Sequence, residues 1–378
     1  MNGNADRVAD ILKNSLRGQS LAANNGGVVS LAIGEPSFPT PKCIVDAQAE
    51  ALEQGFTHYA VQTGDPLLVG AILDCDVPAI SSLSDANNVL VTHGGAAGLA
   101  SSILGLINPG DVVLIENPTY SLYADAIRLA GGVVKSFGRV AGGGLAFDEI
   151  KALAREAKMI IVCQPSNPTG TILSSAEWQQ LSDIARDHHL VVLSDEAYCN
   201  IVFDGCDFVS ALSIPELEDR VIVCRTFSKK YAMTGWRIGY LVGTASLIHA
   251  AATAHRTFNG AVNSANQRAA IAALQHAAAD AEAMRVEFQA RRELMVSCLK
   301  GGAQLQFSVP SGAFYLWVAY PETFGDSQQV AKICLDKGVR VRPGSEFGSA
   351  GKYRIRLSFA PDRESITEGC RRFLAVFD

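Results

Sequence analysis

The chain has 378 residues, of which 48% are hydrophobic and 19% charged, and it carries a formal net charge of −6. This length allows two domains, and the composition is typical of a globular protein. The acidic balance argues against a nucleic-acid-binding protein. The sequence contains no apolar run of about 18 residues, which argues against a transmembrane helix.

The nine cysteines are scattered along the chain, are odd in number and include no C-x-x-C pair. This pattern favours reduced thiols over disulfides or a zinc site, so we expect no metal ligands. Residues 1–6 show no basic segment followed by an apolar one, which argues against a secretory signal. We therefore expect a cytoplasmic protein.

Over the first two thirds of the chain, short apolar runs rich in β-branched residues alternate with helical patterns. The runs predict buried strands at residues 88–92, 112–116, 132–137, 159–163, 190–194 and 221–224. The segments between them predict helices, including residues 94–107, 120–130 and 175–188. This alternation predicts an α/β fold with a mostly parallel sheet covered by helices on both faces. In such sheets ligands bind beyond the carboxyl ends of the strands.

The C-terminal third has a different pattern. A long alanine-rich helical pattern covers residues 264–299. It is followed by predicted strands at residues 315–318, 339–341 and 354–358, with helices at residues 327–336 and 363–377. These elements predict a second, smaller α+β domain.

A glycine-rich turn at residues 92–98 follows a predicted strand and opens a predicted helix. Backbone N–H groups at a helix N-terminus can bind an anion, and glycines let a phosphate approach closely. Such a turn is equally typical of an ordinary strand-to-helix connection. It lacks the G-x-G-x-x-G spacing of a dinucleotide fold, which argues against a nicotinamide-dependent dehydrogenase.

Three other predicted strands end in residues suited to binding an aromatic cofactor. The ring of Tyr120 could stack on a pyridine ring, and the amide of Asn167 could donate to a phenolate oxygen. Asp195 could pair with a protonated pyridine nitrogen, which would make the ring a better electron sink. Taken singly, each motif is also typical of an ordinary turn or of a solvated strand end.

The most informative segment, residues 226–240, follows the predicted strand at residues 221–224. A lysine here could act as an amine nucleophile toward an aldehyde, and Thr226, Ser228 and Arg237 could hold a phosphate. An aldehyde and a phosphate on one small molecule describe pyridoxal 5'-phosphate. The alternative is a surface loop with ordinary lysines.

This segment resembles the cofactor-lysine motif of the class I and II aminotransferases, in the aspartate aminotransferase superfamily of fold type I. In that motif the lysine follows a small residue and precedes an arginine by eight positions, which matches Lys229 and Arg237 rather than Lys230. The Asn-Pro-Thr-Gly sequence at residues 167–170 is a second family marker. The resemblance runs from about residue 31 to residue 373.

The resemblance implies a seven-stranded type of sheet in a large cofactor-binding domain, residues 41–290. It implies a small C-terminal domain, residues 291–378, to which an N-terminal segment, residues 1–40, contributes. Lys229 would hold the cofactor as an internal aldimine and move a proton, with Asp195 and Tyr198 as further catalytic residues. The cofactor-binding residues implied are Tyr59, Gly95, Ala96, Ala97, Tyr120, Asn167, Asp195, Tyr198, Thr226, Ser228, Lys229 and Arg237.

Substrate binding is implied for Arg356, which would grip the α-carboxylate, and for the backbone of Gly34. Because the residue matching Tyr59 reaches the neighbouring subunit in the family, we expect a homodimer with shared active sites. We also hypothesise that Arg256 recognises a substrate side chain across the dimer.

The function implied is transfer of an amino group from an amino acid to a 2-oxo acid. Other fold type I pyridoxal-phosphate enzymes, namely β-eliminating lyases, γ-synthases and decarboxylases, are the alternative. A non-catalytic cofactor-sensing domain would need a DNA-binding extension, for which the acidic chain offers little before residue 31.

Overall fold

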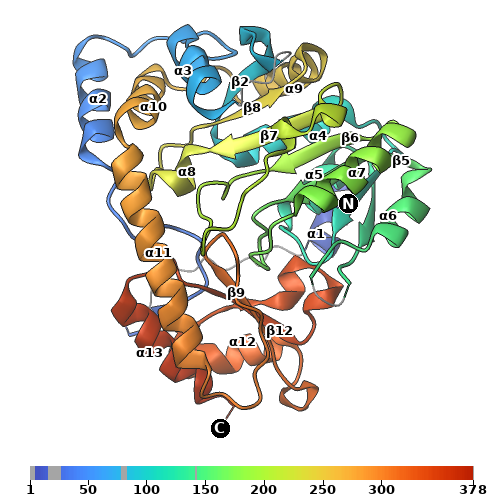
Figure 1. Ribbon diagram of the computed structural model, residues 1–378, viewed down its shortest axis with the longest axis vertical. Helices are drawn as coiled ribbons and strands as arrows, with labels where there is room; N and C mark the ends of the chain where they lie inside the picture. Colours follow the sequence, from blue (N-terminus) through green and yellow to red (C-terminus); the bar gives the residue numbers. More distant parts are fainter. Residues whose placement is uncertain (1–4, 16–26, 78–82, 141–142, 378) are drawn as a thin grey trace.

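The computed structural model describes residues 5–15, 27–77, 83–140 and 143–377. Its largest element is a seven-stranded sheet in the order β2-β8-β7-β6-β5-β3-β4 (Figure 1). The strands are β2 (Val89–Thr92), β3 (Val112–Glu116), β4 (Val133–Phe137), β5 (Ala157–Cys163), β6 (Val191–Asp195), β7 (Val221–Thr226) and β8 (Gly239–Gly243). Strand β8 is antiparallel to both neighbours, whereas the other pairings are parallel. The predicted α/β class and mostly parallel sheet are therefore confirmed.

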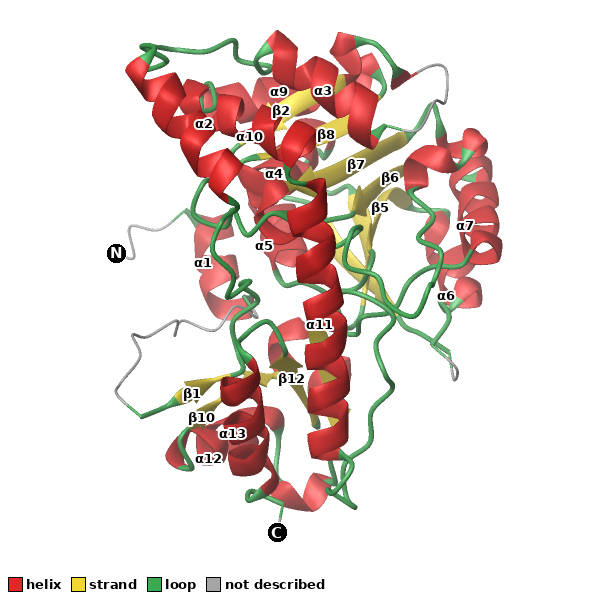
Figure 2. Cartoon of the chain, turned by 60° about the vertical axis from the view of Figure 1, so that its left-hand side comes forward, coloured by secondary structure: helices red, strands yellow, loops and turns green. Residues whose placement is uncertain are grey.

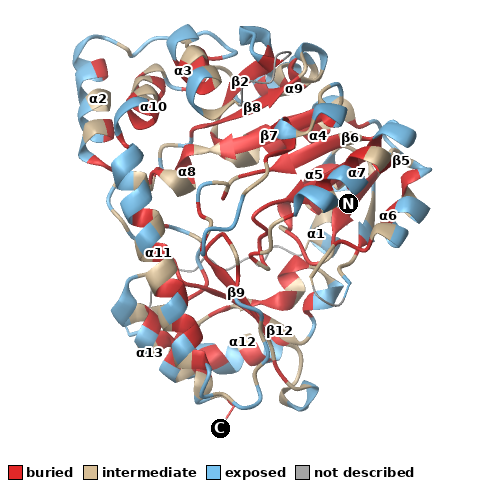
Figure 3. Cartoon of the chain, viewed as in Figure 1, coloured by how far each residue is buried: buried red, intermediate tan, exposed pale blue. Residues whose placement is uncertain are grey.

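Helices cover both faces of this sheet. Alternate strand residues point to opposite faces, so each face presents apolar side chains that pack on helices. One face packs on α4 (Gly94–Leu106), α5 (Leu122–Leu129) and α9 (Ala245–Phe258). The other face packs on α2 (Lys42–Glu53), α3 (Pro66–Asp76), α6 (Phe147–Ala154), α7 (Ser175–Asp187) and α10 (Ser264–His276). The sheet is consequently the buried middle layer, as its colouring in Figure 3 shows.

A second group of elements surrounds a separate apolar core. Strands β11 (Arg342–Pro343), β12 (Arg354–Ser358) and β9 (Tyr315–Ala319) form an antiparallel sheet in that order. The N-terminal strand β1 (Val29–Ser30) pairs in parallel with β10 (Val339–Arg340). Helices α12 (Ser327–Asp336) and α13 (Arg363–Leu374) lie beside these strands (Figure 2). The N-terminal segment therefore contributes to this smaller group of elements.

The helical pattern over residues 264–299 forms two helices rather than one. Helix α10 ends at His276, and α11 (Ala278–Leu299) begins after Ala277, whose backbone angles of φ −103° and ψ 20° leave the helical region. Helix α11 then runs from the large sheet to the small ones as one continuous rod (Figure 2). The expected domain boundary at residue 290 falls inside this helix and stays a prediction.

The remaining α-helices of the described ranges are α1 (Asp6–Asn14) near α5, and α8 (Phe227–Lys230) directly after β7. Within the described ranges, no helix combines the length and apolarity needed to cross a membrane.

Candidate active site

A cavity of about 350 Å³ is lined by residues at the carboxyl ends of the parallel strands and by residues of the small antiparallel sheet. Its volume is within the usual range for small-molecule sites. Most of the residues predicted for the site line this one cavity, although they come from distant parts of the chain. They are Gly34, Gly95, Ala96, Tyr120, Asn167, Asp195, Tyr198, Thr226, Ser228, Lys229, Arg237 and Arg356.

Lys229 lies on the one-turn helix α8, which β7 positions at the edge of the cavity. Its Nζ donates to the carbonyl oxygen of Gly34 at 2.7 Å. Burial lowers the pKa of Lys229 from 10.5 to about 8, and the charges of Arg237 and Arg356 act in the same direction. A much larger fraction of this amine is therefore uncharged near neutral pH than for an ordinary lysine, as suits a nucleophile or general base.

Asp195 ends strand β6 and is buried. Its carboxylate accepts from the Tyr123 hydroxyl at 2.6 Å and from the backbone N–H of Ala197 at 3.1 Å. Burial raises the pKa of Asp195 above its ordinary value, although both hydrogen bonds oppose that shift. No cationic side chain within the described residues forms an ion pair with it. The carboxylate is thus suited to a cation supplied by a ligand.

The opposite end of the cavity is suited to an anion. Helix α4 begins at Gly94, so the N–H groups of its first turn have no partner within the helix. Gly94 has a φ of +76°, and a Cβ built there would lie 2.5 Å from Nη2 of Arg237. Only glycine allows the arginine to approach this helix end so closely. The hydroxyls of Thr226 and Ser228, 3.0 Å apart, line the same end.

Arg356 comes from strand β12 and is buried. Its Nη1 donates to Oδ1 of Asn167 at 2.9 Å, and its Nη2 donates to the carbonyl of Ala32 at 2.6 Å. Its Nε is buried without a hydrogen-bond partner among the described residues. A guanidinium held in this way has N–H groups left over for a carboxylate.

Comparison with known proteins identifies the chain. The sequence model of the family described as aminotransferase class I and II matches residues 26–373. The chain belongs to the class I and II aminotransferases. It is therefore a pyridoxal-phosphate-dependent transaminase that acts on amino acids and 2-oxo acids, as the sequence motifs predict.

Several relatives carry individual names. A probable aspartate aminotransferase from Methanocaldococcus jannaschii is 34% identical over 93% of this chain and 93% of its own length. An arginine–pyruvate transaminase from Pseudomonas aeruginosa is 33% identical over 91% of this chain and 88% of its own length. The solved structure of a Thermus thermophilus aspartate aminotransferase mutant matches with a TM-score of 0.88 at 30% identity, covering 100% of both chains.

The residues of this aminotransferase fit pyridoxal phosphate at both ends of the molecule. Buried Asp195 needs a cationic partner, and a protonated pyridine nitrogen is one. The anion site at the start of α4 offers N–H groups, two hydroxyls and a guanidinium to the phosphate. Lys229 lines the same cavity, with a pKa that favours reaction with the aldehyde.

Three of the predicted site residues do not line the cavity of this aminotransferase chain. Ala97 lies in the first turn of α4 but outside the cavity lining. Tyr59 is fully exposed, and Arg256 is exposed on α9. Neither Tyr59 nor Arg256 lines the cavity of its own chain.

Sequence reasoning missed Tyr123, Tyr315 and Arg342. The Tyr123 hydroxyl holds Asp195, and Tyr315 donates to or accepts from the Tyr198 hydroxyl at 2.7 Å. Arg342 lines the cavity and pairs with Glu346 at 2.6 Å. Helical spacing could have suggested Tyr123, three residues after Tyr120. Nothing local marks Tyr315 or Arg342, because they reach the site only through pairing of the small strands.

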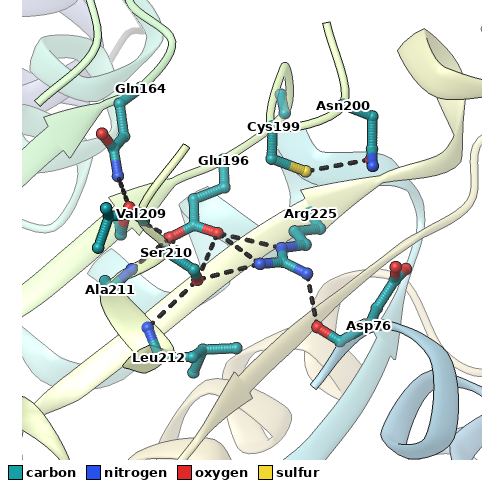
Figure 4. Close-up of polar contacts among 12 residues, drawn as sticks. Asp76, Gln164, Glu196, Cys199, Asn200, Val209, Ser210, Ala211, Leu212 and Arg225 are labelled. Carbon is teal, nitrogen blue, oxygen red and sulfur yellow. Dashed lines mark hydrogen bonds and ion pairs between the residues drawn. The ribbon is translucent and has the colours of Figure 1, made fainter. Parts of the chain in front are cut away.

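Glu196 follows Asp195, and the sequence motif assigns it no contact with the cofactor. The structure places it outside the cavity lining, in a buried network (Figure 4). Its carboxylate pairs with Arg225 at 2.8 Å and accepts from the Ser210 hydroxyl and the Ala211 N–H. Arg225 in turn donates to the carbonyl of Asp76. Glu196 is thus fully paired within the structure.

Proposed function

We propose that this aminotransferase works through Lys229, which binds the cofactor aldehyde and moves the proton that transamination requires. The observation that carries this proposal is that one cavity brings a lysine of lowered pKa together with a buried carboxylate lacking a cation. When bound, pyridoxal phosphate supplies an electron sink for negative charge at the substrate α-carbon.

The other residues would orient that chemistry. Asp195 would keep the pyridine nitrogen protonated, and Tyr120 would cover one face of the ring. Asn167 and Tyr198 would donate to the 3'-oxygen, since the Asn167 amide keeps its N–H groups after accepting from Arg356. The phosphate would bind the groups at the start of α4, namely Gly95, Ala96, Ala97, Thr226, Ser228 and Arg237.

The substrate would be held by its α-carboxylate. Arg356 lines the cavity and its Nε has no hydrogen-bond partner among the described residues. Gly34 also lines the cavity, and its carbonyl accepts from Lys229. Once bound, the substrate α-carbon would lie within reach of the Lys229 amine. That amine would take the proton from the α-carbon and return it to the cofactor's C4' atom.

We propose a homodimer in which each subunit completes the other's site. Tyr59 is fully exposed and outside the cavity of its own chain, although the family motif assigns it to the cofactor phosphate. Arg256 is likewise exposed, on the helix that packs against α4, and would recognise a substrate side chain across the dimer.

The division into residues 1–40, 41–290 and 291–378 is proposed on the two separate groups of apolar cores, with α11 shared between them. A cytoplasmic location is proposed because all nine cysteines are free thiols, which suits a reducing compartment.

A panel of amino donors tests the function directly. The purified protein, loaded with pyridoxal phosphate, is given aspartate, an aromatic amino acid, arginine or alanine, with 2-oxoglutarate or pyruvate as acceptor. Formation of the matching 2-oxo acid and amino acid is expected from at least one pair. Lys229→Ala should abolish turnover, whereas Lys230→Ala, which alters the adjacent lysine, should keep most of it. Wild-type turnover by Lys229→Ala would refute the assignment.

A further inference from the structure

Tyr315 lies at the point where the cofactor side and the substrate side of the cavity meet. It begins strand β9, is 2% exposed and lines the cavity. Its hydroxyl lies 2.7 Å from the hydroxyl of Tyr198, which follows strand β6 of the large sheet. Its ring lies 4.0 Å from the guanidinium carbon of Arg356, on the neighbouring strand β12. Tyr315 therefore contacts both Tyr198, which is proposed to bind the cofactor, and Arg356, which is proposed to bind the substrate carboxylate.

Strand pairing explains the contact with Arg356. Arg356 is directly opposite Trp317, and Tyr315 is two residues from Trp317 on the same face. Tyr315 and Arg356 are thus diagonal neighbours, a separation that a long and an aromatic side chain can bridge. The guanidinium also lies 4.8 Å from the ring of Phe347. Two rings and the two acceptors already described hold Arg356 in one orientation.

The contact with Tyr198 has a different consequence. A phenol has a single proton to donate but can also accept. When the Tyr315 hydroxyl donates to the Tyr198 oxygen, the proton of Tyr198 is left free to point at another acceptor in the cavity. Burial raises the pKa of both phenols, so both protons are retained at neutral pH.

We propose that Tyr315 is a positioning residue that aims the Tyr198 proton at the cofactor's 3'-oxygen and fixes the carboxylate-binding face of Arg356. This inference rests on the proposed function. Its two parts use different atoms: the hydroxyl acts toward the cofactor, and the ring acts toward the substrate carboxylate. Two substitutions can therefore separate them.

Tyr315→Phe removes only the hydroxyl. The Tyr198 hydroxyl then loses the donor at its oxygen, and its own proton is no longer aimed at the 3'-oxygen. A hydrogen bond donated to the anionic 3'-oxygen favours the deprotonated chromophore, so weakening that bond raises the pH midpoint of the visible absorbance change of the bound cofactor. The expected rise is about 0.4 to 1 pH unit, which corresponds to one net hydrogen bond. The KM for the 2-oxo acid and the Kd for propionate, a non-reacting carboxylate, should stay within about twofold because the ring remains over Arg356.

Tyr315→Leu removes the ring as well. The same midpoint shift is expected, now with an increase of about 3- to 30-fold in the Kd for propionate and the KM for the 2-oxo acid, because the cation–π contact is lost. Tyr320→Phe is the matched control. Tyr320 is 5% exposed, its hydroxyl has no partner in the described part of the chain, and it lies outside the cavity lining, so neither readout should move.

The inference is overturned if Tyr315→Phe leaves the absorbance midpoint unchanged, or if Tyr315→Leu leaves both carboxylate constants unchanged. If Tyr315→Phe does not fold, Gly34→Ala replaces it. A Cβ on Gly34 would lie 1.9 Å from the Tyr315 hydroxyl, so the two must move apart. A shift of that hydroxyl away from Tyr198 should raise the midpoint in the same way. Failure of the proposed function is a separate result, because the wild-type protein would then show no absorbance titration and no turnover.

Discussion

At the scale of single residues, burial acts on two titratable groups in one cavity in opposite chemical directions. It lowers the pKa of the Lys229 ammonium and raises the pKa of the Asp195 carboxyl, since the charged form of each is disfavoured away from water. The first shift increases the uncharged, nucleophilic form of the amine. The second shows that the buried carboxylate lacks a cationic partner within the part of the chain that the structure describes. Both fit the same cofactor, which carries an aldehyde and a basic nitrogen.

The lowered pKa of Lys229 predicts how fast the apoprotein captures pyridoxal phosphate at different pH values. Only the uncharged amine attacks the aldehyde, so the rate should rise between pH 7 and 8 and level off above the pKa of about 8. Stopped-flow absorbance of the bound cofactor measures this rate. Nα-acetyl-lysine, with an ordinary pKa of about 10.4, should continue to gain rate up to that pH. A protein profile that follows the free amino acid would contradict the buried position of Lys229.

The role proposed for Asp195 predicts a loss of rate rather than of cofactor. Asp195→Asn keeps the shape but cannot hold the pyridine proton, so kcat should fall by about 10²- to 10³-fold. The groups proposed to bind the phosphate at the start of α4 are untouched. The protein should therefore still bind the cofactor, as equilibrium dialysis would show. Asp195→Glu, which retains a carboxylate, should recover part of the rate. Equal rates for Asp195→Asn and the wild type would rule out this role.

At the scale of elements, the site depends on strand ends that are tied together behind it. Asp195 ends β6, and Lys229 follows the end of β7. Glu196, which directly follows β6, pairs with Arg225 of β7 in the buried network of Figure 4. This pair links the two segments that carry the proposed catalytic groups Asp195 and Lys229.

Breaking that pair should be costly. Glu196→Ala leaves the Arg225 guanidinium buried without its partner, which is expected to lower the free energy of unfolding by about 3–5 kcal/mol. Asp46→Ala is the control, because Asp46 pairs with Lys42 at 2.6 Å on the surface, where both side chains are more than half exposed. Its cost should be below about 1 kcal/mol. Denaturant unfolding compares the two variants, and equal costs would contradict the structural role of Glu196.

Elements with a long or strongly apolar pattern could be predicted from the sequence. Elements selected by tight packing of their backbone against a neighbouring strand could not. The strand at residues 112–116 and the helix at residues 327–336 match the structure. Strand β8 was not predicted, because it has a glycine at each end. A Cβ on Gly239 would lie 2.7 Å from the Arg225 carbonyl, so tight packing on β7, not strand propensity, selects that residue.

At the scale of the whole molecule, the fully exposed Tyr59 and the 70% exposed Phe258 are large aromatic residues on the surface of an isolated chain. A dimer that buries them and completes two sites predicts complementation between inactive subunits. Tyr59→Ala and Lys229→Ala should each show little activity at low cofactor concentration. In a hybrid dimer, one site would combine an intact Lys229 with the partner's intact Tyr59. Mixing the unfolded variants and refolding them together should therefore restore activity.

Complementation has a clear counter-result. If the refolded mixture has only the average activity of the two variants, each site is complete within one chain. If the Tyr59→Ala variant binds the cofactor with wild-type affinity, that result also contradicts the shared site. Sedimentation of the wild-type protein provides the control, because a dimer must be present at the assay concentration for either result to count.

The parts of the site that could be predicted are those carried by short motifs at the ends of strands in the large sheet. Lys229, Asp195 and Asn167 each follow a predicted strand, and they line one cavity because parallel strands end at the same edge. Tyr315 and Arg342 could not be predicted, since their places depend on the pairing of small strands far along the chain. Pairing of this kind leaves no local signal in a sequence.

One measurement tests the central claim most directly. The protein is incubated with pyridoxal 5'-phosphate, reduced with borohydride, digested and examined by mass spectrometry. The expected result is a phosphopyridoxyl group on Nζ of Lys229 in nearly all molecules, with adjacent Lys230 unmodified. An adduct on a different side chain, or none in protein supplied with the cofactor, would contradict the account.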